Sequence, residues 1–517
     1  MAQPQSRTST NKSPIFRLRG QNDEFYPSST LSPENTEILE RVNITETGSI
    51  RRAFGSAKYN ATQITESSVS KSVTGLWQQV YHNDTERNYE TAGTKVYTDD
   101  GTTRTDITGS LTLTDSADAR YRFAYTKDQV IATNGVDETW AASGTGNATA
   151  LSGVPWTTCE DLVVAKNLLV ALAPTVGGTK FPTRIQWCDI NTATFELDIT
   201  NWPSDSIYEL YEGSDGILGG VEFRGRLFVV KEDGVYPMSI GVDNGFIEVF
   251  ADDQLQPLRG EFTPVAKNSI VALPNFMFVI AEDGAYRINP DLTYDLVTDK
   301  IQETWNGLNK GRLQYAHSFV RQSDHQIRTL LSSSPNTTGH DRTLVYDYQT
   351  GDVWIEPISN TPNVMAEWSV SNVKYDIAGS TDGYVRQGND STKTDDDGTD
   401  ITWRIRGAAN DLGHPGASKT IVQLITYYKS KGGQQTITSI VYRDDGLEKN
   451  RSSVLTLGTM LDYNDGNQYN TGLNFGGGTT SQKGFFVNRG CDTVSPQWSG
   501  TEDFELIGYQ VEYQITE

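Results

Sequence analysis

The chain has few of the features that mark a membrane-spanning, secreted or disulfide-bonded protein. Hydrophobic residues make up 36% of its 517 residues, and no run approaches the roughly 18 apolar residues that a transmembrane helix needs. The only cysteines, Cys159, Cys188 and Cys491, are too widely spaced to suggest a disulfide framework or a cysteine-rich zinc site. We expect three buried structural thiols. The first residues lack the apolar stretch of a signal peptide, so we expect no signal-dependent secretion.

Basic residues are also scarce. The chain has 43 Lys and Arg against 66 Asp and Glu, a net charge of -23. Such a surface repels phosphate backbones and anionic lipids, so we expect neither stable nucleic-acid binding nor membrane insertion. The one basic bias lies near the N-terminus, where Arg7, Lys12, Arg17 and Arg19 precede the first acidic residue, Asp23. This stretch favours a plain disordered tail, with a flexible arm that lies against an acidic neighbour as the alternative.

The usual catalytic patterns are absent. The sequence has no HExxH, GxSxG or GxxxxGK[ST] motif, and no spacing typical of metal ligands connects its five histidines, His82, His317, His325, His340 and His414. One stretch, "TDDDGTDITW" (Thr394 to Trp403), resembles a sialidase Asp-box with the wrong spacing. We therefore predict no cofactor, no catalytic residues and no hydrolytic activity.

Two acidic stretches resemble fragments of a calcium loop. They are Asp395 to Asp397 with Gly398, and Asp462 with Asn464 and Gly466. Neither completes the D-x-[DN]-x-[DN]-G pattern with a Glu six residues later. We interpret both as solvated acidic turns and predict no metal site.

What the sequence does contain favours an all-β protein. It has 59 Thr and 24 Tyr, which suit half-buried strands, and 47 Gly, which suit tight turns. Aromatic residues make up 10%, too many for a disordered chain.

A repeat with a period of 50 residues lies near the middle of the chain. Residues Val221 to Tyr236 match Val271 to Tyr286 at seven of sixteen positions without a gap. Each copy has an apolar strand, an Asp-Gly turn and a second strand that opens near a tyrosine, which predicts a β-hairpin. The turn residues are Asp233 with Gly234 and Asp283 with Gly284, where we expect glycine to supply the positive φ of a type I′ turn. A weaker copy contains Asp382 and Gly383.

Units of 40 to 50 residues with several short strands are typical of a β-propeller. About six such units fit between residues 70 and 395, whereas a sandwich of meanders, the alternative, lacks such a repeat. We assign residues 70–395 to the propeller and residues 396–517, where strands alternate with a period of two, to a separate antiparallel β-sandwich, the platform. Residues 1–69 are assigned to an N-terminal arm and a short helical segment that packs on the platform.

Two short helices are expected. Ser32, Pro33 and Glu34 look like a helix start that would continue through Ile38 and Leu39. A second helix is expected from Thr298, because Ile301 and Trp305 lie four residues apart and Gly307 follows.

Three stretches together resemble one known family. The segment from Leu18 to Gly55 resembles the opening of the tail nozzle, or packaged-DNA stabilisation, proteins of short-tailed phages. The matching positions are Gly20, Asn22, Pro27, Asn43, Gly48, Arg51 and Gly55. The hairpins "EDGVY" and "EDGAY", and the segment from Ala378 to Ile401, are similar to that family as well.

The resemblance implies a structural protein rather than an enzyme. It implies a homohexameric ring in the virion tail, made in the cytoplasm of the host bacterium. The expected partners are the phage adaptor and portal complex, a tail fibre or tailspike, needle or plug proteins, and genomic DNA that passes without specific binding. The ring would extend the DNA channel, retain packaged DNA and conduct it during ejection.

A different class of function is also compatible with the sequence. A glycan-binding or polysaccharide-degrading propeller of a phage tail would need a carbohydrate pocket, and Trp140, Trp354 and Trp403 could line one. We interpret these tryptophans as packing residues.

Overall fold

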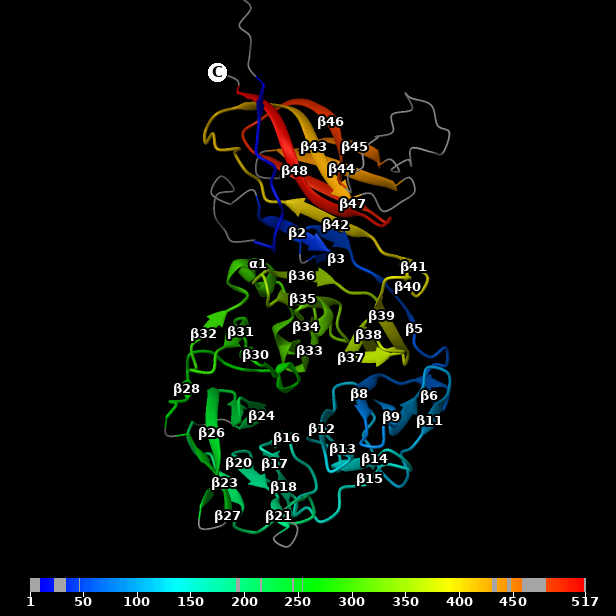
Figure 1. Cartoon of the computed structure of the whole chain (residues 1–517), viewed down its shortest axis with the longest axis vertical. Coiled ribbons are helices and arrows are strands. Elements are labelled where there is room, and N and C mark those ends of the chain that lie inside the picture. The colour runs from blue at the N-terminus through cyan, green and yellow to red at the C-terminus, as the bar shows by residue number, and fades with distance from the viewer. Residues whose placement is uncertain are drawn as a thin grey trace, which may run out of the picture.

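A ring of small sheets and a pair of larger sheets make up the fold (Figure 1). The computed structural model describes residues 10–22, 34–45, 47–191, 196–213, 216–243, 246–252, 254–429, 435–443, 448–457 and 480–515. Within these ranges, no helix is long and apolar enough to cross a membrane. The second calcium-like stretch, around Asp462, lies outside the described residues, as do Arg7, Ser32 and Pro33.

Seven antiparallel sheets of the described residues surround one axis, so the chain contains a β-propeller. From the innermost strand outward, the blades contain these strands: blade 1, β8 (Val73–Val80), β9 (Glu86–Ala92), β10 (Lys95–Asp99) and β11 (Arg104–Asp106); blade 2, β12 (Arg122–Thr126), β13 (Gln129–Thr133), β14 (Trp140–Ser143) and β15 (Thr149–Ala150); blade 3, β16 (Asp161–Ala165), β17 (Leu168–Leu172), β20 (Arg184–Trp187) and β23 (Ile207–Glu209); blade 4, β24 (Ile217–Phe223), β25 (Arg226–Lys231), β26 (Gly234–Asp243) and β27 (Phe246–Ala251); blade 5, β29 (Val271–Leu273), β30 (Phe276–Ile280), β31 (Ala285–Ile288) and β32 (Tyr294–Leu296); blade 6, β33 (His317–Arg321), β34 (Gln326–Leu331), β35 (Arg342–Asp347) and β36 (Val353–Pro357); blade 7, β37 (Pro362–Val370), β38 (Val373–Ser380), β39 (Val385–Asp390) and β5 (Gly55–Lys58).

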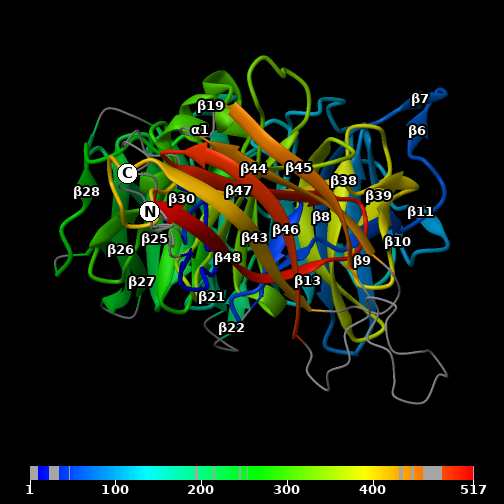
Figure 2. The ribbon, with the colours of Figure 1, turned by 90° about the horizontal axis from the view of Figure 1, so that it is seen from above.

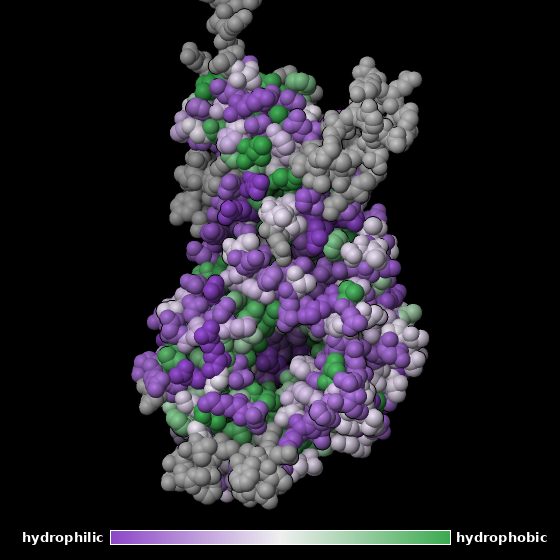
Figure 3. Space-filling model, in the orientation of Figure 1, coloured by the Kyte–Doolittle hydropathy of each residue, from purple (hydrophilic) through white to green (hydrophobic). Residues whose placement is uncertain are grey.

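The ring is closed. The innermost strands of consecutive blades contact one another from blade 2 to blade 7, and β37 contacts β8 of blade 1. Blades 1 and 2 meet where the rings of Trp77 and Phe123 stack with their centroids 5.8 Å apart. A hollow is visible at the centre of the propeller face (Figure 3).

Blade 7 is completed by a strand from near the start of the chain. Strand β5 pairs with β39, where Lys58 lies opposite Arg386, and it also pairs with β40 (Asp395–Asp396), which forms a small hairpin with β41 (Thr399–Asp400). The structure therefore has seven blades where we expected about six, and the propeller includes residues 55–58, which we had assigned to the N-terminal segment.

Two further antiparallel sheets form the second part of the molecule, which we call the platform. One contains β3 (Val42–Ile44), β4 (Ile50–Arg52), β48 (Glu505–Ile515), β43 (Lys419–Lys429) and β46 (Thr480–Cys491), with β1 (Asn11–Lys12) paired to β48. The other contains β2 (Thr36–Glu40), β42 (Trp403–Gly407), β47 (Val494–Gly500), β44 (Gln435–Arg443) and β45 (Glu448–Leu457). Both chain ends build the platform, and the propeller is inserted between them.

One hydrophobic cluster joins the two platform sheets and also reaches the propeller. It contains Leu424 of β43 and Trp498 of β47 from the platform, together with Val345 and Trp354 of blade 6. All four side chains are fully buried. In Figure 2, which views the molecule from above, the platform strands lie over the blade ring. Because blade 6 shares this core, the two parts pack as one unit.

Further short elements lie between the strands of a blade or between blades. They are the strand pairs β6 (Thr65–Glu66) with β7 (Val69–Ser70), β18 (Thr175–Val176) with β19 (Thr179–Lys180) and β21 (Asp189–Asn191) with β22 (Glu196–Asp198); strand β28 (Leu258–Arg259); the 3-10 turns η2 (Lys267–Ser269), η3 (Asp299–Ile301), η4 (Lys310–Tyr315) and η5 (Gln322–Asp324); and the helix α1 (Gln302–Asn306). The helix expected from Thr298 is confirmed by η3 and α1. Ile301 and Trp305 are fully buried, and the element ends at Gly307.

The other expected helix is wrong. Ile38 and Leu39 lie in strand β2, where Leu39 pairs with Ile405 of β42. The platform sheet offers this segment a strand partner, and tertiary pairing overrides the local helix signal.

The expected disordered tail and its alternative, the flexible arm, are both wrong from residue 10 onward. The Ser13 and Phe16 amides donate to the carbonyl oxygens of Val511 and Tyr509, 2.9 and 2.8 Å away. Phe16 and Leu18 are buried in the platform core, so this segment is a fixed part of the platform. It does lie against an acidic neighbour, because Lys12 Nζ is 2.6 Å from Glu512 Oε1.

Candidate functional site

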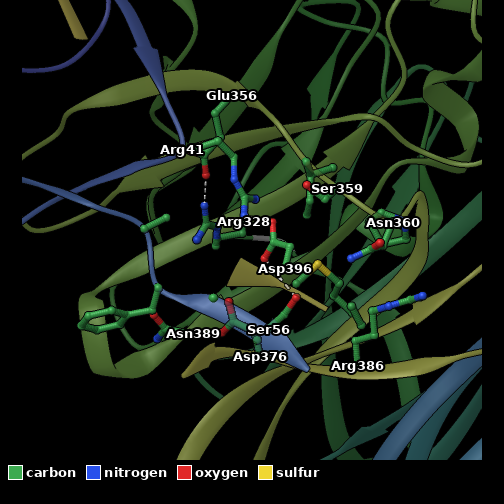
Figure 4. A pocket seen from close by; sticks show the side chains of 18 of the residues that line it. Arg41, Ser56, Arg328, Glu356, Ser359, Asn360, Asp376, Arg386, Asn389 and Asp396 are labelled. Carbon is green, nitrogen blue, oxygen red and sulfur yellow. Dashed lines mark hydrogen bonds and ion pairs between the residues drawn. The ribbon is translucent and has the colours of Figure 1, made fainter. Parts of the chain in front are cut away.

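A pocket lies where the platform strands meet blades 6 and 7. We call it the junction pocket (Figure 4). The N-terminal segment contributes Arg41 and Ser56, blade 6 contributes Arg328 and Glu356, and Asp396 comes from the connection that leaves the propeller. Residues more than 300 positions apart in the sequence thus share one wall.

Three arginine–carboxylate pairs form the walls of the junction pocket. Arg321 bonds Asp376 with its Nε 3.0 Å from Oδ1, Arg328 pairs with Glu356, and Arg41 pairs with Asp396. The Arg321, Arg328 and Glu356 side chains are at most 8% exposed. A buried ion pair requires a partner for every charge, so these pairs fix the relative positions of the segments that carry them.

Burial and neighbouring charges perturb the two blade 6 arginines in opposite directions. Burial and, to a lesser extent, the positive charge of Arg321 together lower the pKa of Arg328 to about 10. Burial also acts to lower the pKa of Arg321, but Asp376 more than offsets it, so this pKa is raised. Both guanidinium groups remain charged at neutral pH.

The serines of the junction pocket are not paired with a histidine. Its lining residues include Ser56, Ser359 and Ser380 but neither His nor Cys. Ser56 Oγ donates to Asp396 Oδ1 at 3.0 Å, and Asp396 is itself paired with Arg41, which leaves it poorly placed to act as a base. The arrangement is suited to holding the propeller and platform together.

The six predicted turn residues lie in three hairpins. Lys231 pairs with Gly234, and the amide of Ala281 donates to the carbonyl of Gly284 at 2.8 Å. The type I′ assignment is wrong for both copies of the 50-residue repeat. Glycine follows the two central turn residues instead of occupying a central position, and Gly284 does not have a positive φ.

A tyrosine explains the repeated sequence of these hairpins. Tyr236 Oη donates to Asp233 Oδ2 at 2.7 Å, and Tyr286 Oη donates to Asp283 Oδ2 at 2.6 Å. Asp and Tyr therefore act together in both copies. The aspartates act as structural acceptors in the turns.

The third predicted turn is the one that reaches the junction pocket. Gly383 has a φ of +80°, and Asp382 accepts hydrogen bonds from the pocket residue Arg386 at 2.7 and 3.1 Å. A Cβ on Gly383 would lie 2.6 Å from the carbonyl oxygen of Ile64, so this position requires glycine.

Two aspartates of the acidic stretch Asp395 to Asp397 are paired with protein cations, and Asp395 accepts a hydrogen bond from the Gly398 amide. Besides the Arg41 pair of Asp396, Asp397 Oδ2 lies 3.2 Å from Arg386 Nε and 3.7 Å from Lys58 Nζ. Across the part of the chain that the structure describes, no group of three or more His, Cys, Asp or Glu could hold a metal ion.

The remaining candidates have structural roles. Trp140, Trp354 and Trp403 are fully buried, as expected for packing residues. Cys159, Cys188 and Cys491 are buried and form no disulfide, and burial raises the pKa of both Cys159 and Cys188 to about 12.

Sequence reasoning missed the ion pairs of the junction pocket, although the sequence contains a weak signal for one of them. Arg328 sits in "QIRTLL" and Glu356 in "VWIEP", charged residues inside apolar strands. A charged residue in a run that is otherwise buried requires a partner, but only the fold shows which one.

A second buried charge cluster lies in blade 1. Glu90 is fully buried, with Oε2 2.7 Å from Arg104 Nε, while Arg104 Nη2 lies 2.7 Å from Asp99 Oδ2. Burial, offset in part by Arg104 and reinforced by Asp99, raises the pKa of Glu90 to about 8. Glu90 and Asp99 share the single guanidinium of Arg104, which can balance only one negative charge. The protonated, neutral form of Glu90 is therefore favoured.

This cluster predicts a pH-dependent stability. Because the folded pKa of Glu90 lies above its usual 4.5, its stabilising contribution is complete below about pH 4.5 and is lost as pH rises through about 8. The Gln side chain of Glu90→Gln is neutral at every pH, like the protonated form of Glu90. At pH 9, where wild-type Glu90 would be ionised and buried, we therefore expect the variant to have the higher melting temperature. At pH 5, where Glu90 is protonated, we expect little difference. The exposed Glu138→Gln is the control. Parallel pH profiles for wild type and Glu90→Gln would contradict this assignment.

Comparisons with known proteins give only distant matches. No protein-family model and no curated protein matches the chain. Among solved structures, the Neurospora crassa Pan2 WD40 domain is similar at 8% identity and a TM-score of 0.40, covering 68% of this chain and 99% of its own. The computationally designed Ika8 protein is similar at 13% identity and a TM-score of 0.37, covering 62% of this chain and 96% of its own. The propeller assignment rests on the seven sheets and their closure.

Proposed function

We propose that this chain is a structural tail nozzle protein of a short-tailed phage. Copies would form a six-membered ring below the adaptor, retain packaged DNA and conduct it during ejection. The observation that carries the proposal is the position of the described residues of the stretch from Leu18 to Gly55 that resembles that family, because they join the platform to the propeller; the matching Pro27 lies outside the described residues.

The glycines of this stretch occupy positions where the backbone requires them. A Cβ on Gly20 would lie 2.9 Å from the Val353 amide nitrogen of blade 6, and one on Gly55 would overlap the Asp395 carbonyl oxygen. Gly48 has a φ of +75° in the turn between β3 and β4. These requirements of the fold support the resemblance at three of its seven positions.

Two further matching residues belong to the same junction. Asn43 is 2% exposed and lines the junction pocket, and the guanidinium carbon of Arg51 lies 4.3 Å from the centre of the Phe54 ring. Substitutions here would loosen the contact between the platform and the propeller.

The charge of the chain suits a conduit for DNA. A net charge of -23 disfavours the lysine and arginine contacts to phosphate that give proteins most of their nonspecific DNA affinity. DNA would thus pass without being held. Ring formation would then depend on subunit contacts strong enough to overcome the mutual repulsion of six acidic chains, and added salt would weaken that repulsion.

A genome-retention experiment tests the proposal. Phage particles assembled without this protein should package DNA and then lose it, because nothing would close the tail below the adaptor. Encapsidated DNA is measured over time by nuclease protection, with particles complemented by the wild-type chain as control. Equal retention with and without the chain would refute the nozzle function.

A further inference from the structure

Two exposed cations lie side by side on one face of the propeller. Lys166 is the first residue of the turn between β16 and β17 in blade 3, and Arg224 holds the same position between β24 and β25 in blade 4. A Cβ on Gly225 would lie 3.7 Å from Lys166 Cε, so the two turns adjoin. Blade 2 has Lys127 at this position, but Asp128 follows it, so that turn carries no net charge.

The conformation of the two turns does not explain these cations. Their central residues have φ values between +45° and +76°, and turns with a positive φ at both central positions favour Asn, Asp or Gly there. Asn167 and Gly225 follow this preference, whereas Lys166 and Arg224 do not. The cations therefore indicate a role outside the turn itself.

Neither cation has a carboxylate partner within the part of the chain that the structure describes. Lys166 Nζ donates to the Ile240 carbonyl oxygen at 2.9 Å. Arg224 Nε donates to the Pro274 carbonyl oxygen at 2.9 Å, and its Nη2 donates to Asn275 Oδ1 at 3.3 Å. All these acceptors are neutral. Two like charges thus remain unbalanced next to each other on a chain whose net charge is -23.

Exposed acids occupy turns on the opposite face. Glu232 and Glu282 are the first of the two central residues in the turns between the second and third strands of blades 4 and 5, and both are exposed. Among the described residues, neither carboxylate is in an ion pair. The nearby Lys310 Nζ donates to the carbonyl oxygen of Glu282, at 3.3 Å.

The acids and the cations of one copy lie too far apart to pair with each other. Strand β25 separates Arg224 from Glu232 and has six residues, which span about 20 Å. This distance exceeds the range of about 8 Å over which exposed charges interact at physiological ionic strength. A partner for either pair of charges must therefore come from another molecule.

We propose that these two faces bind each other in neighbouring copies of this chain, with Lys166 and Arg224 of one copy against Glu232 and Glu282 of the next. The inference rests on the proposed ring and names a contact within it. Each pair of charges spans two neighbouring blades, so the pairs match in extent and are opposite in sign. A contact between two different faces is head-to-tail, which can close into a ring. Exposed ion pairs add little affinity, so this contact would mainly set the orientation of each copy.

Charge reversal tests the contact in rings assembled on the adaptor and portal complex and counted by electron microscopy. Glu232→Lys with Glu282→Lys should abolish the rings, although it makes the chain less acidic and so weakens the overall repulsion between copies. Lys166→Glu with Arg224→Glu should abolish them as well, because like charges would then face each other.

Restored complementarity separates the loss of this contact from a loss of folding. The variant with all four reversals has the wild-type net charge and should form rings again. A mixture of the two double variants should also form rings, with the variants alternating around the six positions. Neither recovery would occur if Lys166 and Arg224 instead bound DNA phosphates.

The outcomes distinguish this contact from the nozzle function. If Glu232→Lys with Glu282→Lys forms rings as complete as those of the wild type, the contact is wrong and the nozzle function stands. If both the four-fold variant and the mixture fail to form rings, the contact is also wrong. An absence of rings in the wild-type chain would instead contradict the proposed function together with this inference.

Discussion

Substitution of Glu356 by Ala is expected to lower the free energy of unfolding by about 3–5 kcal/mol. Glu356 is 2% exposed, pairs with Arg328 and accepts a bond from the Val42 amide of the platform at 3.3 Å. Its loss leaves a buried guanidinium without a counter-charge and removes a polar contact between the propeller and the platform. Chemical denaturation measures the change.

Two controls separate the buried pair from a general loss of charge. The double variant Arg328→Met with Glu356→Leu should recover most of the lost stability, because it removes both charges and fills their volume. Lys374→Ala breaks a half-exposed pair with Glu367 and should cost less than about 1 kcal/mol. If Glu356→Ala is as mild as Lys374→Ala, the junction pairs do not hold the two parts together.

Gly234→Val is expected to lower the free energy of unfolding by a few kcal/mol. Gly234 opens β26 with a φ of +150°, and a Cβ there would overlap the carbonyl oxygen of Leu258 in β28. A backbone carbonyl cannot move aside as a side chain can, so β28 would have to leave its pairing with β26.

The second copy of the repeat supplies a matched control. A Cβ on Gly284 would overlap side-chain atoms of Leu296 and Thr298, and side chains can rotate away. We therefore expect Gly234→Ala to lower the melting temperature more than Gly284→Ala. An unchanged melting temperature in Gly234→Val would show that the backbone contact with β28 is absent.

The propeller could be predicted because its hairpins are local. The strands of a hairpin are adjacent in sequence, and the bond between Asp233 and Tyr236 spans three residues. Such short-range features leave a repeated pattern that a single sequence displays. The 50-residue repeat therefore identified blades 4 and 5 directly.

The closure of the ring could not be predicted in the same way. Strand β5 contains only Gly-Ser-Ala-Lys and has no apolar alternation, and its partner β39 lies more than 300 residues further along the chain. Strand β2 was mistaken for a helix because Ser32, Pro33 and Glu34 look like a helix start shortly before Ile38 and Leu39, which lie in this strand. In both segments, the strand structure is determined by pairing with a strand that lies far away in the sequence.

The junction pocket depends on long-range contacts even more strongly. Arg41 and Asp396 are separated by 355 positions, so no spacing in the sequence relates them. The hairpin residue Asp382 was identified as a turn, but its bonds to Arg386 were not. Local motifs indicate turns, whereas ion-pair networks between blades appear only in the folded chain.

Electron microscopy of the purified chain bound to the adaptor and portal complex tests the central claim most directly. The nozzle account predicts six copies in a closed ring around a channel wide enough for duplex DNA, located at the end of the tail. A single copy, or a ring whose centre is too narrow for DNA, would contradict it.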